Sequence, residues 1–306
     1  LHDFLAARLV VEQPHSIATL NRRAAQCFQQ RGDLEQALQH AQRSNDSALF
    51  RRLLEEACEQ WVRSGHFAEV LKWLEPLSES ELFASPRLLV PMVYALTLSR
   101  RFHQARYCLD ELGVRSRCEP TVDGLTRQLL ALNLELFQFD LGFTPGERWS
   151  DLLATGVPPE IRALALSILS YHHLLNARLQ QAISMALEAK ALLEQTGQSV
   201  LESYADLIIA LCNRNACRAT SARKDVYHDY QRTERSSPAW VNRATAMVVA
   251  LYEQNQLAAA QQLCEDLMAM VTSSSATETI ATVHITLSRL LYRRQSDGRA
   301  GRLLEQ

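Results

Sequence analysis

Histidine, cysteine and acidic residues are the side chains of this 306-residue chain that could hold a metal or perform catalysis, and their spacing favours neither. His172 and His173 are adjacent. On a helix adjacent side chains point about 100° apart, so the pair cannot easily face one ion. His228 and Asp229 follow one helix pair later, but no nucleophile adjoins them. We therefore predict no metal, no cofactor and no enzymatic activity.

The sequence signatures of nucleotide-binding and common catalytic sites are also missing. The chain contains no GxxxxGK[ST], GxGxxG, HExxH, GxSxG or calcium-loop pattern. Its three lysines, Lys72, Lys190 and Lys224, do not follow glycine-rich loops. We expect no ATP hydrolysis by this chain.

Composition points to a helical cytoplasmic protein. Ten glycines and nine prolines are few for the turns of a β-rich fold. The 32 basic and 34 acidic residues leave a net charge of −2, without the basic excess that binds nucleic acid. Seven cysteines without a CxxC pair indicate free, buried thiols in a reducing compartment, with Cys212 and Cys217 as small core residues. No apolar run approaches the roughly 18 to 20 residues of a membrane span, so we predict no membrane association.

The helices that position the polar side chains named above follow a repeated pattern in the sequence. Phe28 is followed by Gly32 and then by Ala37, and the same spacing recurs 33 residues later between Trp61 and Val70. An aromatic residue and a later small residue interlock where two helices cross, and a glycine between them allows a tight turn. This spacing is typical of a tetratricopeptide repeat.

Further along, the glycine is lost but the small residue that opens the second helix persists. These positions are Ala105, Ala182, Ala260 and Gly301. Wide gaps between them predict hidden repeats near residues 132–153 and 207–230. We predict an all-α, right-handed superhelix (solenoid) of about eight stacked antiparallel helical hairpins over residues 15–306. Residues 15–112 would form an arm with the first repeats, and residues 113–306 would form longer, degenerate repeats.

The first helix of each hairpin should line the concave face of such a superhelix. Counting back from turns expected at Ala177, Ala216 and Asn255 places polar or amphipathic side chains there. They are Ser167, Tyr171, Ser203, Asp206, Asn213, Arg214, Asn242, Thr245, Tyr252 and Glu253. A few hydrogen-bonding groups between apolar walls suit a small-molecule groove, and ordinary polar residues on a solvated surface are the alternative. The ligand contacts that we predict are Ser167, Tyr171, Asp206, Asn213, Arg214, Asn242 and Tyr252.

The first hundred residues resemble a known family. The succession runs from LHDFLAARLVVEQP through IATLNRRAAQCFQQRGDLEQALQHAQRSND to LKWLEPLSESELFASPRLLVPMVYALTLSRRFHQA. It is similar to the MalT-like, ATP-dependent transcriptional regulators of the LuxR family. The match covers residues 1 to about 110, and Arg100 stands where the family usually has glycine. The resemblance implies that residues 1–14 are the tail of a preceding winged-helix region.

The resemblance also implies a function. The chain would be the sensor segment of a regulator, binding a small-molecule inducer or an inhibitory protein. Such binding would bias an ATPase and a DNA-binding domain that this chain lacks, and a ligand can do so only by preferring one arrangement of the superhelix. The full-length regulator could form a homo-oligomer. The alternative is a repeat scaffold or adaptor that binds peptides or proteins, although three lysines offer little for clamping a peptide carboxylate.

Overall fold

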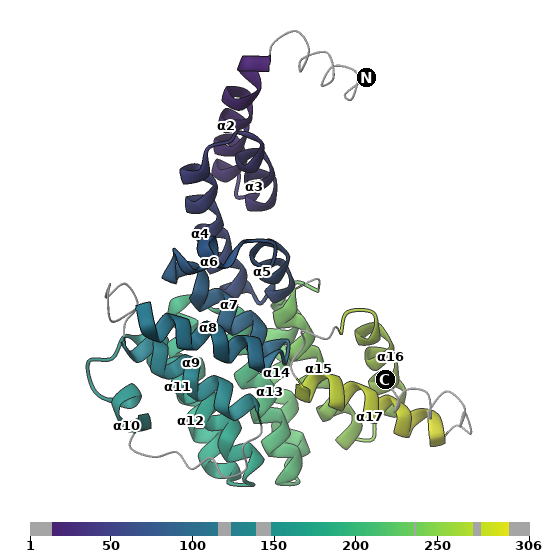
Figure 1. Ribbon diagram of the computed structural model, residues 1–306. Coiled ribbons are helices and arrows are strands. Elements are labelled where there is room, and N and C mark those ends of the chain that lie inside the picture. The colour runs from purple at the N-terminus through teal and green to yellow at the C-terminus, as the bar shows by residue number, and fades with distance from the viewer. Residues whose placement is uncertain (1–13, 116–123, 139–147, 236, 272–276, 294–306) are drawn as a thin grey trace, which may run out of the picture.

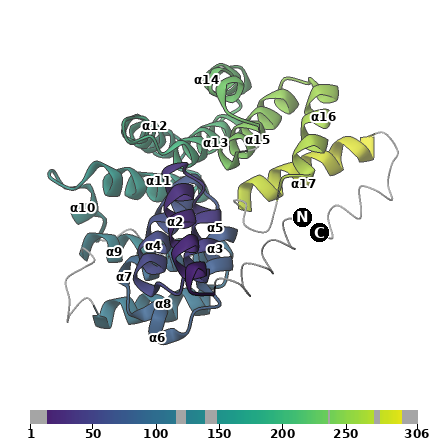
Figure 2. The ribbon, with the colours of Figure 1, turned by 90° about the horizontal axis from the view of Figure 1, so that it is seen from above.

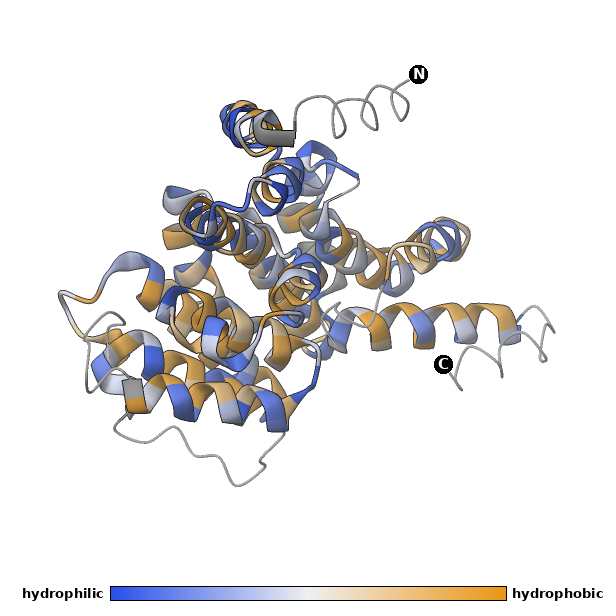
Figure 3. Ribbon diagram, turned by 45° about the horizontal axis from the view of Figure 1, so that its top comes forward, coloured by the Kyte–Doolittle hydropathy of each residue, from blue (hydrophilic) through white to orange (hydrophobic). Residues whose placement is uncertain are grey.

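The computed structural model describes residues 14–115, 124–138, 148–235, 237–271 and 277–293. These residues form sixteen α-helices and no strand, which confirms the all-α prediction (Figure 1). Hydrophobic residues are interleaved with hydrophilic ones along the helices (Figure 3), and none of the described helices is long and apolar enough to cross a membrane. The predicted winged-helix tail lies almost entirely outside the described residues.

The first four helices, which we call the arm, begin in a narrow projection and end beside the broader part of the molecule (Figure 1). They are α2 (Pro14–Gln30), α3 (Leu34–Arg43), α4 (Ser47–Ser64) and α5 (Phe67–Leu74). The arm leads into a broader body. Its helices are α6 (Glu79–Phe83), α7 (Pro86–Leu98), α8 (Phe102–Arg115), α9 (Gly124–Phe137), α10 (Arg148–Leu153), α11 (Pro159–Leu175), α12 (Leu179–Thr196), α13 (Ser199–Asn215), α14 (Ala219–Arg232), α15 (Pro238–Glu253), α16 (Leu257–Met268) and α17 (Thr277–Arg293).

Consecutive helices joined by short turns pack in pairs. The pairs are α2/α3, α4/α5, α7/α8, α11/α12, α13/α14 and α15/α16. A second set of contacts joins alternate helices of the body. Each helix of the series α7, α9, α11, α13, α15 and α17 contacts the next one in that series. Figure 2 shows that α11 to α17 form a curved row and that the arm stands on its inner side.

The turns within these pairs share one backbone geometry. Each contains a residue with positive φ, and these residues are Gly32, Gly65, Arg100, Ala177, Cys217 and Asn255. The next amide donates to the carbonyl oxygen five residues earlier, as from His66 to Trp61 at 2.8 Å. This bond ends the helix in the Schellman manner. The turns predicted at Ala177, near Ala216 and at Asn255 are confirmed, and the left-handed residue of the second is Cys217.

Small residues lie where the sequence predicts them, at the packed faces of the second helices. Five of these positions, Ala37, Val70, Ala105, Ala182 and Ala260, are completely buried. The hidden repeat over residues 207–230 corresponds to the pair α13/α14, while the one over residues 132–153 contains α9 and the six-residue α10. Gly301 lies outside the described residues.

The cysteine prediction is only partly right. Cys58, Cys108, Cys212 and Cys264 are free and buried, and burial raises the pKa of Cys58 to about 12. Cys27 and Cys217 are exposed, contrary to the expectation of burial. Cys217 is exposed because it occupies a turn rather than a helix face. Cys118 lies outside the described residues.

Candidate ligand-binding site

The turn between α4 and α5 forms one wall of the site. Asp46 caps the start of α4 by accepting a hydrogen bond from the Leu49 amide at 3.0 Å, and the helix ends at Gly65 with a φ of 76°. We call this turn the arm tip. It is the end of the arm nearest the body, and it packs on α13 and α15. A Cβ atom at Gly65 would lie only 3.0 Å from a methyl carbon of Val200 and 3.3 Å from Pro238. The tip of the arm therefore packs closely against the curved row.

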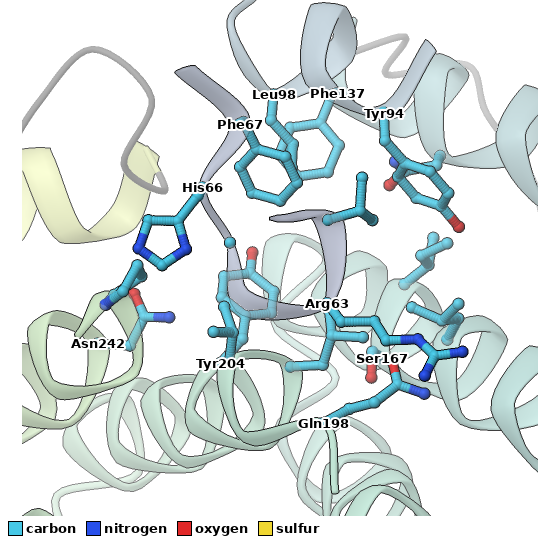
Figure 4. Close-up of a pocket in the computed structure, with 18 of the residues that line it drawn as sticks. Arg63, His66, Phe67, Tyr94, Leu98, Phe137, Ser167, Gln198, Tyr204 and Asn242 are labelled. Carbon is cyan, nitrogen blue, oxygen red and sulfur yellow. The ribbon is translucent and has the colours of Figure 1, made fainter. Parts of the chain in front are cut away.

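Next to this contact lies a cavity of about 390 Å³ (Figure 4). Its walls come from the arm tip, from α7, α9, α11, α13 and α15, and from Met270. Figure 4 shows Phe67 of the arm beside Leu98 of α7 and Phe137 of α9. Small-molecule sites commonly have volumes of roughly 300 to 1,000 Å³ and mainly apolar walls with a few polar groups. The cavity has both properties.

Three of the seven predicted ligand contacts, Ser167, Tyr171 and Asn242, line this cavity. The Ser167 hydroxyl donates to the carbonyl oxygen of Ala163 at 2.9 Å. The Asn242 amide nitrogen donates to Ser203 at 3.1 Å, and its oxygen accepts from Thr279 at 3.3 Å. The Asn242 side chain therefore links α13, α15 and α17 while it faces the cavity.

Tyr171 is tied to a carboxyl far away in the sequence. Its hydroxyl donates to Glu278 at the start of α17, and the Tyr204 hydroxyl donates to the other oxygen of the same carboxyl at 3.3 Å. Burial raises the pKa of Glu278, although the two hydroxyls and the nearby Arg100 act in the opposite direction. Burial also raises the pKa of both tyrosines, so their hydroxyls remain protonated donors. Neither Tyr204 nor Glu278 belongs to a pattern that would single it out in the sequence.

Asp206 lies elsewhere, in a buried ion-pair network between α12, α13, α14 and α15. Its carboxylate binds Lys190 at 2.7 Å and Arg243 at 2.9 Å, and the Asp206 and Arg243 side chains are 2% and 7% exposed. Arg243 also binds Glu202, and Lys190 binds Asp229 at 2.8 Å. Burial alone would lower the pKa of Lys190, but its two carboxylate partners raise it. The three carboxylates are therefore engaged by two buried cations rather than arranged around an open position.

The other predicted contacts do not line the cavity either. Asn213 and Arg214 end α13, and Tyr252 is near the end of α15. Asn213 is buried, and Tyr252 packs against the apolar cluster that includes Trp240 and Leu287. The structure thus separates the predicted set into a cavity group, an ion-pair residue and a group at the opposite helix ends.

Several polar residues of the wall were not predicted, namely Arg63, His66, Tyr94, Asn133, Gln198 and Tyr204. Asn133 of α9 and Tyr94 of α7 both line the cavity. Asn133 is the single amide in the apolar run from Leu129 to Leu134, and this signal could have identified it. Its side chain is only 6% exposed. The contribution of the arm tip, by contrast, has no local sequence signal.

No model of a known protein family matches the chain, and a search of curated proteins finds no relative. The described lining of the cavity combines apolar walls with hydroxyl and amide groups and with the side chains of Arg63 and His66. Mainly apolar walls with a few polar groups are typical of small-molecule sites.

Proposed function

We propose that the chain binds a small molecule in the cavity between the arm and the curved row, and that the ligand controls how these two parts pack. The observation that carries the proposal is the shared wall. Val62 and Phe67 come from the arm, whereas Ile168 and Val241 come from the row. A ligand in the cavity contacts both parts at once.

A sensor requires a ligand that contacts both of the parts whose packing it controls, here the arm and the row. A ligand changes a conformational equilibrium only by its difference in affinity for the two states. Because the Gly65 turn already touches Val200 and Pro238 closely, a displacement of the arm tip would alter the shape of the cavity. Ligand affinity would then depend on the position of the arm, and the position of the arm on the ligand.

We further propose that this coupling serves transcriptional regulation. The support is the resemblance of residues 1 to about 110 to MalT-like regulators. In such a protein the arm would pass the change to an ATPase and thence to a DNA-binding domain outside this chain. The proposal includes the right-handed tetratricopeptide-like superhelix, which the recurring turns and the contacts between successive first helices support. The arm tip already occupies the inner side of the row, which leaves less room there for a bound peptide.

The test uses N-phenylnaphthylamine, an uncharged apolar dye whose fluorescence rises in apolar sites. We expect the purified chain to bind the dye and to melt at a higher temperature in its presence. Ser167→Leu fills the cavity and should weaken dye binding about tenfold or more, equivalent to ~1.4 kcal/mol. Ser80→Leu, at an exposed serine of α6, is the matched control and should bind as the unmodified chain does.

A second filling variant, Val241→Phe, acts from the opposite wall and replaces Ser167→Leu if that variant does not fold. The coupling is tested by hydrogen exchange, in which dye binding should slow exchange of the Gly65 and His66 amides. Dye binding that neither filling variant weakens would place the site elsewhere. Unchanged exchange at the turn would separate ligand binding from movement of the arm.

A further inference from the structure

The hydrogen bonds of the cavity wall restrict which ligands it can hold. The hydroxyls of Tyr171 and Tyr204 donate to Glu278, and the hydroxyl of Ser167 donates to a backbone oxygen. Each hydroxyl oxygen can still accept a hydrogen bond, but its one proton is already engaged. These three side chains therefore present acceptors to the ligand.

Asn133 and Tyr94 differ from Ser167, Tyr171, Tyr204 and Asn242, and the half-buried Gln198 of the same wall shares the difference. Within the described part of the chain, neither the Asn133 amide nor the Tyr94 hydroxyl has a hydrogen-bond partner. Asn133 is only 6% exposed, but its amide atoms are not among the fully buried atoms that lack a partner, so they remain accessible from the cavity that the residue lines. Burial raises the pKa of Tyr94, so its hydroxyl remains a donor. Because α7 packs on α9, both groups belong to one side of the cavity.

Charge gives a second restriction. Among the described residues of the wall, the arginine is Arg63, whose side chain is 64% exposed and already binds Glu59 at 2.7 Å. His66 is exposed and bonded to Ser64 at 2.7 Å. Behind the two tyrosines stands the Glu278 carboxyl. The nearby Arg100 is exposed and does not line the cavity. A carboxylate or phosphate in the cavity would therefore meet acceptors and an acidic group without a buried cation, and burying such a charge unpaired is costly.

We infer that the ligand is an uncharged, mainly hydrocarbon molecule with one group that both donates and accepts hydrogen bonds, such as a primary amide or a hydroxyl. This inference rests on the proposed function, since it concerns the same cavity. The ligand's polar group binds Asn133 and Tyr94, and its donor protons can also reach the acceptor oxygens of the wall. Its hydrocarbon part lies against residues such as Phe67, Phe137 and Val241.

The test compares decanamide with decanoate, which share a chain length and differ in charge. Each is titrated against the N-phenylnaphthylamine complex at neutral pH. We expect decanamide to displace the dye at a concentration about tenfold or more below that of decanoate, because the anion would be buried without a partner. Asn133→Leu should weaken decanamide binding about tenfold more than it weakens dye binding, and Tyr94→Phe should have a smaller effect in the same direction.

Asn213→Leu is the matched control, because Asn213 is as buried as Asn133 but lies outside the cavity wall. It should leave decanamide binding unchanged. If Asn133→Leu does not fold, Tyr94→Phe carries the test.

Two outcomes would overturn the ligand class and leave the proposed binding site in the cavity unaffected. They are equal displacement of the dye by decanoate, and decanamide binding that neither wall variant weakens. Loss of decanamide binding in Asn213→Leu alone would move the site to the ends of α13 and α15. Failure of the dye itself to bind would reject the proposed function.

Discussion

The arm and the curved row bury their helices in different ways. In α3 of the arm the buried residues are Leu34, Ala37, Leu38 and Ala41, which mark one face of the helix. In α15 of the row every residue from Ala239 to Leu251 is buried. An amphipathic helix reveals its packed side through its sequence period, whereas a helix buried all round does not. The comparison shows why polar residues of the row are harder to assign than those of the arm.

Two neighbours on α15 illustrate the difficulty. Asn242 lines the cavity and bonds Ser203, while Arg243 points into the ion-pair network with Asp206. Both are strongly buried polar residues in an apolar helix. Only their neighbours distinguish a residue that lines the cavity from one that belongs to the ion-pair network.

The largest expected difference between the two regions concerns ion pairs. Arg243→Met would leave Asp206 and Glu202 without one of their cations in a buried site, and should lower the free energy of unfolding by about 3 to 5 kcal/mol. In the arm, Lys72→Met removes an exposed cation from Glu35 and Glu69 and should leave the denaturation midpoint nearly unchanged. Urea denaturation measures both. A small effect of Arg243→Met would mean that the network relaxes or admits water.

A moderate and similar effect is expected at the helix crossings of both regions. Ala37 and Ala182 are fully buried, and replacing either with leucine should cost about 1 to 3 kcal/mol through overpacking. Ala191→Leu, at an exposed position of the same helix as Ala182, is the control. Thermal denaturation would show a lower midpoint for the two buried variants alone. A tolerant Ala182 with a sensitive Ala37 would show that the longer repeats of the row pack more loosely.

The smallest effect concerns the turns, where the arm has glycine and the row does not. Ala177 has a φ of 56°, which strains a residue with a Cβ atom, so Ala177→Gly should raise the free energy of unfolding by up to ~1 kcal/mol. Gly32→Ala should lower it by about 1 kcal/mol through strain alone, since nothing lies within 4 Å of the added Cβ. Differential scanning calorimetry can resolve the two signs. A destabilised Ala177→Gly would indicate that the alanine methyl group makes contacts outweighing the strain.

The sequence by itself determined the repeat. The left-handed turns at Ala177 and Asn255 and the buried small residues at Ala105, Ala182 and Ala260 were predictable, because each hairpin repeats one local geometry. A turn keeps its backbone conformation even where glycine is lost. Local chemistry was therefore sufficient for the helices, for most of their turns and for their packed faces.

Only the tertiary structure decided what the inner side of the row contacts. The Gly65 turn meets Val200, and Tyr171 meets Glu278, across long separations in the chain. Such contacts depend on how the small rotations between successive hairpins accumulate, and no local pattern encodes that sum. Tyr171 lines the cavity, whereas Asn213, which lies closer to the turn that follows its helix, does not. The polar groups that face the cavity are therefore decided by where the arm and the row meet, and the pattern within one helix does not contain that contact.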